Sequence, residues 1–188
     1  MEDRINRNAP GVPFTRRSAI SRAAMAIGAL SFGAFGAQAE LRKEEISHTG
    51  ESIHHETSYK ASRKRVFAAL TDPIQFDKIT HLSDGMKTAP QAGAPTEIVA
   101  KAGSPFRLFG GQIVGWQVEL VPDERIVQAW RVAAWDPGAY SIARFALTEH
   151  DGGTMIAFDH TGFPKGLAEH LAVGWKSHYW EPLDKYLG

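Results

Sequence analysis

The last quarter of the chain changes from one backbone period to another, and this change constrains the fold more than any other feature. Ile156, Phe158 and His160 fall at alternate positions, which is the period of a strand with one buried face. From Pro164 onward the apolar residues recur instead at the period of a helix, up to the C-terminus. A strand that turns into a long amphipathic helix predicts a sheet that the helix covers.

The apolar stripe of this helix ends in aromatic residues. It consists of Leu167, Leu171, Trp175, Tyr179 (or His178), Leu183 and Tyr186. Pro182 lies inside the stripe, where it has no N–H for the carbonyl of His178 and where its ring crowds that carbonyl. We therefore expect a kink in the helix at Pro182.

The preceding segment reads as strands joined by turns. In residues 114–120 the apolar side chains of Val114, Trp116, Val118 and Leu120 alternate with others, which predicts a half-buried strand. We expect residues 103–109 to form a loop. Further strands are predicted at residues 53–59, 85–88, 96–100, 125–132, 140–148 and 154–160.

Two short helices are predicted after the first strand. Ser62 is a suitable N-cap for residues 63–70, in which Val66, Phe67 and Leu70 share one face. Pro73 ends that helix and suits the first turn of a second one, residues 74–79. Helices gathered on one face of an antiparallel sheet define an α+β domain. The sheet is expected to curve around the long C-terminal helix and to leave a cleft between them.

The first 39 residues have the pattern of a cleaved export signal. Arg16 and Arg17 precede an uncharged stretch, residues 23–39, that ends in a small-residue cleavage pattern at Ala37-Gln38-Ala39. An uncleaved anchor and a buried helix are the alternatives, but the order of charge, apolar stretch and cleavage site favours removal. The paired arginines suggest the twin-arginine route. Ala19 stands where such signals usually carry a bulky residue, so the sequence leaves open the general secretory route.

The predicted organisation is a signal at residues 1–39, a polar linker at 40–50 and one domain at 51–188. We expect the mature form to lie in the periplasm or to be secreted, without an integral membrane span. Removal of residues 1–39 leaves 16 basic and 19 acidic residues. A mildly acidic domain without a basic run argues against nucleic acid as a partner.

The residue types argue against several chemistries. The chain has no Cys, so disulfides, thiolate catalysis and Cys-ligated zinc are excluded. His170 and His178 lie eight residues apart on the predicted helix, about 12 Å, which is too far for one metal ion. No serine has a nucleophile-elbow setting. We therefore expect no cofactor, no metal and no catalytic residue.

The chain from about Ile53 to Leu187 resembles the Hsp90-ATPase-activator-homologue (AHSA1-like) branch of the START/Bet v 1-like superfamily, also called SRPBCC. The resemblance rests on a series of short motifs in the same order. They are residues 66–73 (Val-Phe-Ala-Ala-Leu-Thr-Asp-Pro), 111–115, 120–131, Gly153-Thr154, and 160–164 (His-Thr-Gly-Phe-Pro) followed by Gly174-Trp175. It implies the helix-grip fold, with a cavity between the curved sheet and the C-terminal helix.

The resemblance does not imply one activity, because members bind apolar small molecules, act as cyclases or activate the chaperone ATPase. An exported protein meets neither that chaperone nor ATP. The aromatic residues favour a pocket for an apolar ligand, although each one alone is more simply a core residue. The predicted ligand-binding residues are Phe76, Phe106, Phe109, Trp116, Trp130, Phe158, His160, Trp175 and Tyr179.

His160 is the polar residue most open to two interpretations. It could anchor a ligand or act as a general base, but no partner that would tune it can be assigned, since Asp159 points to the opposite face. We favour a structural histidine bonded to backbone at the turn into the helix. Gln128 and Arg144 are the other polar groups expected within reach of the cavity.

These observations predict an exported protein that holds a hydrophobic small molecule between sheet and helix, without catalysis. An enzyme of the cyclase or hydratase kind, with convergent ionisable groups in the cavity, is the first alternative. A protein–protein or chaperone-type interaction module is the second. Such a module would expose apolar residues on the outer sheet face, and the polar alternation of the strands gives little sign of them.

Overall fold

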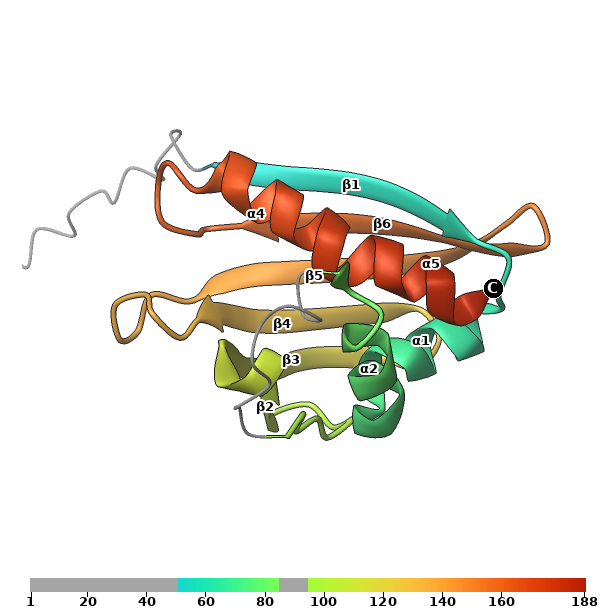
Figure 1. Ribbon diagram of the computed structural model, residues 1–188, viewed down its shortest axis with the longest axis horizontal. Helices are drawn as coiled ribbons and strands as arrows, with labels where there is room; N and C mark the ends of the chain where they lie inside the picture. Colours follow the sequence, from blue (N-terminus) through green and yellow to red (C-terminus); the bar gives the residue numbers. More distant parts are fainter. Residues whose placement is uncertain (1–50, 85–94) are drawn as a thin grey trace, which may run out of the picture. The chain divides into compact units, whose positions relative to one another are not determined.

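The computed structural model describes residues 51–84 and 95–188. The predicted signal, the linker and the predicted strand at residues 85–88 lie outside this part of the chain. Within it, the element order is a strand, two short helices, five more strands and a long C-terminal helical segment (Figure 1). The predicted α+β helix-grip architecture is confirmed.

One antiparallel sheet of six strands forms the framework. Its order is β1-β6-β5-β4-β3-β2, so the first and last strands in sequence lie side by side at one edge. The strands are β1 (Ser52–Tyr59), β2 (Pro105–Leu108), β3 (Ile113–Val121), β4 (Arg125–Val132), β5 (Ser141–His150) and β6 (Gly153–Thr161). Hairpins join β3 to β6 in succession, as the turn signals predict.

The edge next to β3 differs from the sequence prediction. The predicted strand at residues 96–100 is reduced to a single bridge between Glu97 and Arg107. The segment predicted as a loop contains strand β2, and its side chains alternate, with Phe106 and Leu108 buried. The loop prediction was wrong because four residues are too short a segment to show a period beside Gly and Pro.

Strand β3 carries its buried face opposite to the apolar alternation. Gly115 and Gln117 are buried, whereas Trp116 is 48% and Val118 52% exposed. Gly115 is required because a Cβ there would overlap the Phe106 ring and the Ala129 carbonyl. The sheet thus uses a residue without a side chain to seat Phe106. A register shift between Gln117 and Glu119 marks a β-bulge in the same strand.

The two short helices begin as the caps predict. Helix α1 (Arg63–Thr71) starts at Ser62, whose side chain accepts a hydrogen bond from the Arg65 N–H. Helix α2 (Pro73–Thr80) starts at Asp72, which accepts from the Gln75 N–H at 2.9 Å. Pro73 occupies the first turn, where its missing N–H is not needed.

The C-terminal segment covers the concave side of the sheet (Figure 1). It consists of α4 (Ala168–Trp175), a π-helical turn η2 (Lys176–Trp180) and α5 (Glu181–Leu187). The disruption expected at Pro182 therefore takes the form of a wide turn just before the proline. Because this turn holds an extra residue, Trp175 and Trp180 come to stack at 5.8 Å, with their rings 20° apart.

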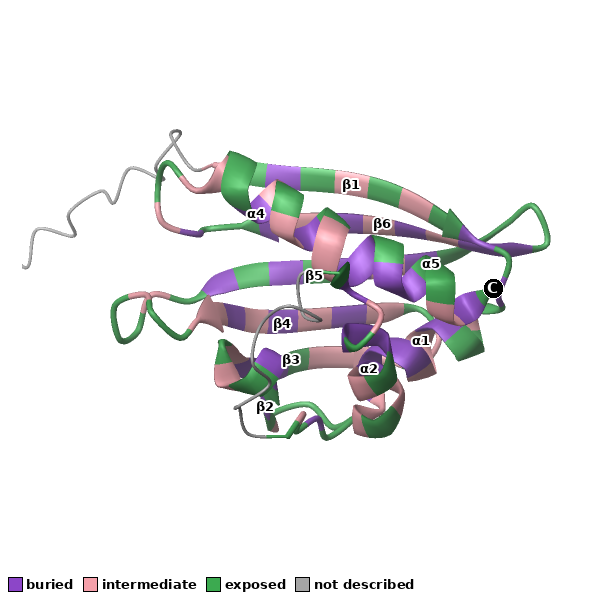
Figure 2. Cartoon of the chain, in the orientation of Figure 1, coloured by how far each residue is buried: buried purple, intermediate pink, exposed green. Residues whose placement is uncertain are grey.

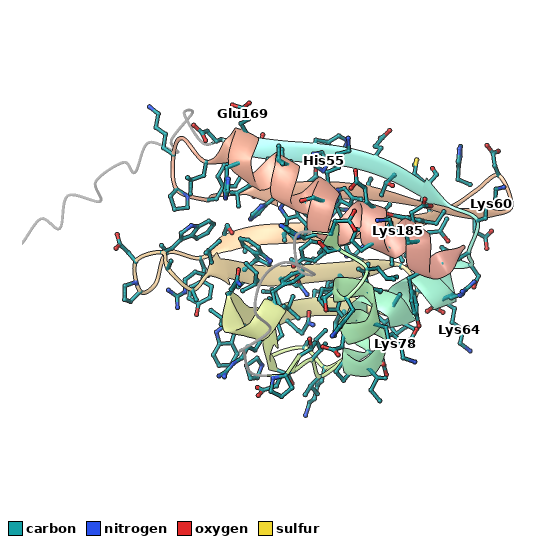
Figure 3. The ribbon with its side chains drawn as sticks, in the orientation of Figure 1. His55, Lys60, Lys64, Lys78, Glu169 and Lys185 are labelled. Atoms are coloured by element: carbon teal, nitrogen blue, oxygen red, sulfur yellow. The ribbon has the colours of Figure 1, made fainter. Side chains whose placement is uncertain are left out.

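Burial follows the contact between the sheet and this helix. The inward side chains of β4, β5 and β6 alternate with outward ones, and the buried positions of α4 and α5 face them (Figure 2). The charged side chains labelled in Figure 3, such as Lys64, Lys78 and Glu169, lie at the surface. Within residues 51–84 and 95–188, no helix is long and apolar enough to cross a membrane.

Candidate functional site

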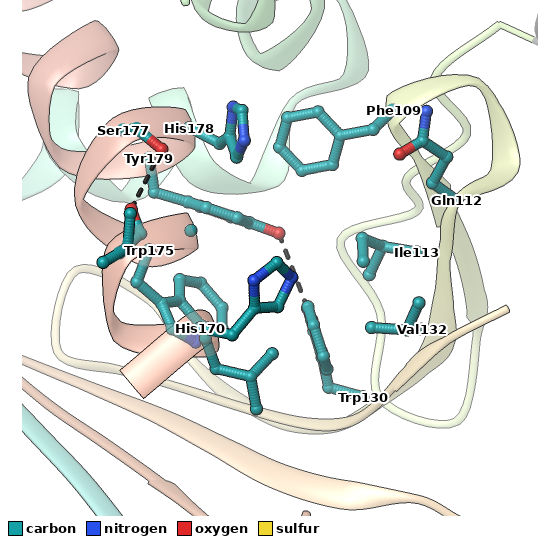
Figure 4. A pocket seen from close by; sticks show the side chains of 13 residues that line it. Phe109, Gln112, Ile113, Trp130, Val132, His170, Trp175, Ser177, His178 and Tyr179 are labelled. Carbon is teal, nitrogen blue, oxygen red and sulfur yellow. Dashed lines mark hydrogen bonds between the residues drawn. The ribbon is translucent and has the colours of Figure 1, made fainter. Parts of the chain in front are cut away.

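A cavity of about 380 Å³ lies between η1 (Phe109–Gly111), the adjoining ends of β3 and β4, and the C-terminal helix (Figure 4). This volume is within the range of small-molecule pockets, which is roughly 300–1,000 Å³. The lining consists of Phe109, Gln112, Ile113, Trp130, Val132, His170, Leu171, Val173, Gly174, Trp175, Ser177, His178 and Tyr179. None of these is Lys, Arg, Asp or Glu, so the part of the wall formed by residues 51–84 and 95–188 carries no permanent charge.

The structure places four of the predicted ligand-binding residues in this lining. They are Phe109, Trp130, Trp175 and Tyr179, which come from η1, β4 and the helix. Their rings contact one another: Trp175 lies 4.2 Å from Tyr179 and 5.4 Å from Trp130, and Phe109 lies 5.2 Å from Tyr179, between centroids. These four aromatic walls form the body of the site.

The other five predicted residues do not line the cavity. Phe76 supports it from behind, with its ring 5.7 Å from those of Phe109 and Tyr179. Phe158 lies beneath Trp175 at 4.3 Å, and Phe106 is buried over Gly115. Trp116 lies on the outer face of the sheet, because β3 has the opposite phase from the one its apolar alternation suggests.

His160, the fifth, is a core residue bonded to side chains rather than to backbone. Its Nε2 lies 2.7 Å from Ser141 Oγ, and its Nδ1 accepts from Trp175 Nε1 at 3.0 Å. The Ser141 hydroxyl donates to the Trp130 carbonyl at 2.8 Å. The Ser141 oxygen must therefore accept from Nε2–H, which fixes one neutral tautomer. Burial lowers the pKa of His160 to about 4, so the ring is neutral at pH 7.

Gln128 and Arg144 do not reach the cavity either. Gln128 is buried, and its amide donates to Gln117 Oε1 at 3.3 Å. Arg144 lies on the outer face, where it donates to Asp159 at 3.4 Å. The prediction that these two residues lie within reach of the cavity was wrong. The prediction that Asp159 points away from the face of His160 is confirmed by its contact with exposed His54.

The sequence analysis did not predict the other nine lining residues as part of the binding site. Among these, His170 was considered only as a metal ligand, and His178 only as a metal ligand or as an alternative to Tyr179 in the apolar stripe. A signal for the helical ones was available, because Leu171, Gly174 and His178 flank Trp175 by three to four positions. Val132 also had a signal, because it lies two residues from Trp130 on the same face of a strand. No such signal marks Gln112 and Ile113, which lie between η1 and the start of β3.

His178 has a fixed hydrogen-bond partner at the cavity wall. Ser83 Oγ lies 2.9 Å from His178 Nδ1 and 3.2 Å from the Ser177 carbonyl, which can only accept. That carbonyl would bond residue 182 in a π-helical pattern, but Pro182 has no N–H, and the Ser83 hydroxyl substitutes for it. His178 Nδ1 therefore donates to Ser83, and Nε2 carries the lone pair. Burial, with His170 nearby, lowers the pKa of His178.

The three interior indoles are bonded unequally. Trp175 donates to His160 at 3.0 Å and Trp180 donates to His55 at 2.8 Å. Trp130, in contrast, lies 3.5 Å from the Tyr179 hydroxyl, at the limit of a hydrogen bond. Figure 4 shows the Tyr179 hydroxyl and the Trp130 ring facing each other in the cavity.

The outer sheet face exposes apolar side chains that the strand alternation did not indicate. Trp116 on β3 pairs with Ala129 on β4, which pairs with Ile142 on β5. Ile142 is 42% exposed, and Val118 lies two residues from Trp116 on the same face. We call Trp116, Val118 and Ile142 the outer apolar row. It is the feature expected of a protein–protein module.

The fold and the cavity together define a helix-grip protein of the START/Bet v 1-like class. Within that class, the chain belongs to the family of Activator of Hsp90 ATPase homolog 1-like proteins, whose profile matches residues 60–188. The profile begins directly after β1 and includes every element that lines the cavity.

Curated relatives match a part of their own length. The chain is 27% identical over 95 residues to the human activator of 90 kDa heat shock protein ATPase homolog 1. This alignment covers 50% of this chain and 28% of that protein. It is 28% identical over 136 residues to an uncharacterized Schizosaccharomyces pombe protein, covering 72% of this chain and 37% of the relative. The chain thus spans well under half the length of these relatives.

Solved structures share the fold. An Hsp90 activator from Plasmodium falciparum aligns with a TM-score of 0.62 and 24% identity, covering 73% of this chain and 96% of that one. CalU16 from Micromonospora echinospora aligns at 0.58 and 20% identity, covering 74% and 77%. At these identities the likeness concerns the fold alone.

Proposed function

We propose that this protein binds a hydrophobic small molecule in the cavity between its sheet and its C-terminal helix, and that it acts as a carrier or sensor rather than an enzyme. The cavity itself carries the proposal: it is about 380 Å³, it has four aromatic walls, and the described residues that line it include no Lys, Arg, Asp or Glu. An uncharged aromatic cavity favours apolar molecules, since transfer of their surface from water stabilises the complex by about 25 cal/mol per Å².

The chemistry of the lining also favours binding over catalysis. A general acid or base needs a titrating group within hydrogen-bond reach of the substrate. His160 is enclosed behind Trp175, and its two nitrogens are engaged by Ser141 and Trp175. His170 and His178 are the titratable imidazoles at the wall. The cyclase or hydratase alternative would have to act through them.

We further propose that the protein is exported through the signal at residues 1–39 and acts in the periplasm or outside the cell. The twin arginines, the uncharged stretch and the Ala37-Gln38-Ala39 pattern support this proposal. The partners would then be the export machinery during transit and a small molecule afterwards.

Native mass spectrometry of the protein recovered from the periplasm, compared with the same sample denatured, tests both proposals. We expect the denatured mass to correspond to cleavage after Ala39. We expect the native mass to exceed it by a non-covalent ligand whose identity the difference reveals. A full-length mass in the cytoplasmic fraction would contradict export. A native sample that stays unliganded when incubated with lipid extract of the source cells would contradict the carrier role.

A second candidate function is protein binding through the outer apolar row, which its exposure favours. Curated relatives are called activators of the 90 kDa heat shock protein ATPase, so a chaperone of that class is the partner to try, as an alternative to the exported carrier. The double variant Trp116→Ser, Ile142→Ser should abolish any stimulation of the ATPase of that chaperone. Ile74→Ser, a matched change of a residue 67% exposed on α2, should not. Absence of stimulation by the wild-type protein would exclude this candidate.

A further inference from the structure

We infer that Trp130 and Tyr179 form a pair of hydrogen-bond donors that selects a ligand with a neutral carbonyl oxygen. The inference rests on the proposed function, because it concerns what the same cavity recognises. It is based on two hydrogen-bond donors in the aromatic walls, for which the described residues offer no acceptor at a normal hydrogen-bond distance.

The Tyr179 hydroxyl is buried and lacks an acceptor among residues 51–84 and 95–188. Its side chain is 5% exposed, and the oxygen receives only the long contact from Trp130 Nε1. Among the residues that the structure describes, none accepts the Tyr179 hydrogen. Burial raises the pKa of Tyr179 above its ordinary value, so the hydroxyl keeps this proton. A buried donor without an acceptor is unfavourable, and a ligand oxygen would relieve that.

The Trp130 N–H is the second donor. The neighbouring indoles of Trp175 and Trp180 each make a bond of 3.0 Å or less to a histidine nitrogen. Trp130 faces a histidine ring too, with its centroid 5.0 Å from that of His160. That histidine, however, is already bonded at both nitrogens. Within the described part of the chain, the Trp130 N–H therefore has only the hydroxyl oxygen at 3.5 Å as an acceptor.

The geometry of the pair fits one oxygen atom. The two donor atoms are 3.5 Å apart, so a single acceptor can lie at a normal hydrogen-bond distance, about 2.9 Å, from both. A carbonyl oxygen has two lone pairs and accepts two such bonds, whereas an ether or aromatic ring accepts them less well. Both donors sit on aromatic walls, so the atoms bonded to the carbonyl would lie among rings.

The charge of the lining decides between a carbonyl and a carboxylate. A carboxylate moved out of water needs a cation or several charge-assisted bonds. Among the described residues the lining holds no Lys or Arg, and burial lowers the pKa of His178, which disfavours the charged form of that side chain. A neutral, mostly apolar ketone, ester or amide therefore fits the site, and a fatty acid anion does not.

Two probes of similar shape test this inference: acetylnaphthalene, which has the carbonyl, and isopropylnaphthalene, which has a methyl group in place of the oxygen. Dissociation constants are measured by quenching of tryptophan fluorescence for the wild-type protein and for Tyr179→Phe. We expect the variant to bind the ketone about five- to tenfold more weakly, which is the loss of one hydrogen bond of about 1 kcal/mol. We expect the affinity for the hydrocarbon to change less than twofold.

Tyr186→Phe is the matched control. It makes the same change on the same helical segment, but Tyr186 bonds Gln75 and lies outside the cavity lining, so both affinities should stay unchanged. In NMR spectra, the indole N–H resonance of Trp130 is assigned as the one that is missing from Trp130→Phe. In the wild-type protein this resonance should shift downfield when the ketone is added and not when the hydrocarbon is added. This second measurement decides the matter even if Tyr179→Phe fails to fold.

The outcomes separate this inference from the proposed function. If both probes bind and Tyr179→Phe weakens them equally or not at all, the donor pair is wrong and the binding cavity stands. If the ketone alone loses affinity, both stand. If the wild-type protein binds neither probe, the inference and the proposed cavity for apolar aromatic molecules both fail.

Discussion

The side chains behind the cavity wall show how single residues define the site. His160 is held in one tautomer by Ser141 on one side and Trp175 on the other. The indole of Trp175 is thereby fixed in orientation, and its ring forms one wall of the cavity. A histidine that neither lines the cavity nor titrates at neutral pH thus positions a residue that does line it.

The neutral state of His160 predicts loss of stability in acid. Its pKa is about 4 in the folded protein and 6.5 when exposed, so the unfolded state binds more protons between these values. The contribution of neutral His160 to the free energy of unfolding is fully present above pH 6.5. It is lost as the pH falls toward 4, and the loss is about 3 kcal/mol. Chemical denaturation of the wild type and of His160→Gln at pH 7 and pH 4.5 measures it.

The quantity to compare is the acid-induced loss of unfolding free energy in the wild type and in His160→Gln. Other histidines add to this loss in both proteins, because burial also lowers the pKa values of His55 and His178, and Asp159 raises that of His54. We expect His160→Gln to be less stable at pH 7 but less sensitive to acid. An equal loss of stability in both proteins would show that His160 is not the titrating group.

A second residue, Ser83, supports the π-helical turn. Its side chain is 1% exposed, and it donates to the carbonyl that Pro182 cannot serve. Ser83→Ala should lower the free energy of unfolding by about 1–2 kcal/mol, because a buried carbonyl loses its donor. Ser177→Ala, which removes an exposed hydroxyl bonded to the Val173 carbonyl, should have a small effect in the same urea titration. Equal effects would refute the role of Ser83.

At the scale of elements, the contact of β2 with β3 decides which side chains enter the core. Phe106 fills the space above Gly115, and Trp116 is turned to the outer face as a result. The adjoining turn η1 then delivers Phe109 to the cavity. An edge strand of four residues therefore sets one wall of the site.

Two glycine substitutions with opposite expected signs test this arrangement. Gly115→Ala should destabilise the protein by at least about 2 kcal/mol, since the new Cβ would meet the Ala129 backbone, which cannot move aside cheaply. Gly174→Ala adds a Cβ with nothing within 4 Å in the middle of the helical segment, and it should stabilise by about 0.5–1 kcal/mol. Thermal unfolding of both variants measures the effects. A neutral Gly115→Ala would contradict the close packing.

At the scale of the whole molecule, the cavity links ligand binding to stability. A ligand that binds only the folded protein adds about 2.7 kcal/mol at 100 times its dissociation constant. The ligand identified from the native protein should therefore raise the melting temperature by several degrees. Val132→Trp, which puts an indole into the cavity from its β4 wall, should abolish this rise. A rise that persists in the variant would place the ligand elsewhere.

The sequence by itself determined the class of fold and most elements. Strands β4 and β6, both capped helices and the stripe of Leu171, Trp175, Tyr179 and Leu183 follow from local periods, because such patterns are set by neighbours along the chain. The places of Trp130, Trp175 and Tyr179 at the interface of sheet and helix were also predicted, since large rings at these periods face the core, whereas Phe109 was named from a segment predicted as a loop. These successes concern residues whose burial their own element decides.

Only the tertiary structure decided the phase of β3, the existence of β2 and the polar partners of the site. Trp116 lies outside because Phe106, ten residues away, occupies the space over Gly115. Ser141 and Trp175 form hydrogen bonds with His160, and Ser83 forms one with His178, between residues that are 15 to 95 positions apart in the sequence. Hydrogen bonds between distant residues leave no period in the chain, and they are what distinguishes the bonded indoles from the donor pair of Trp130 and Tyr179.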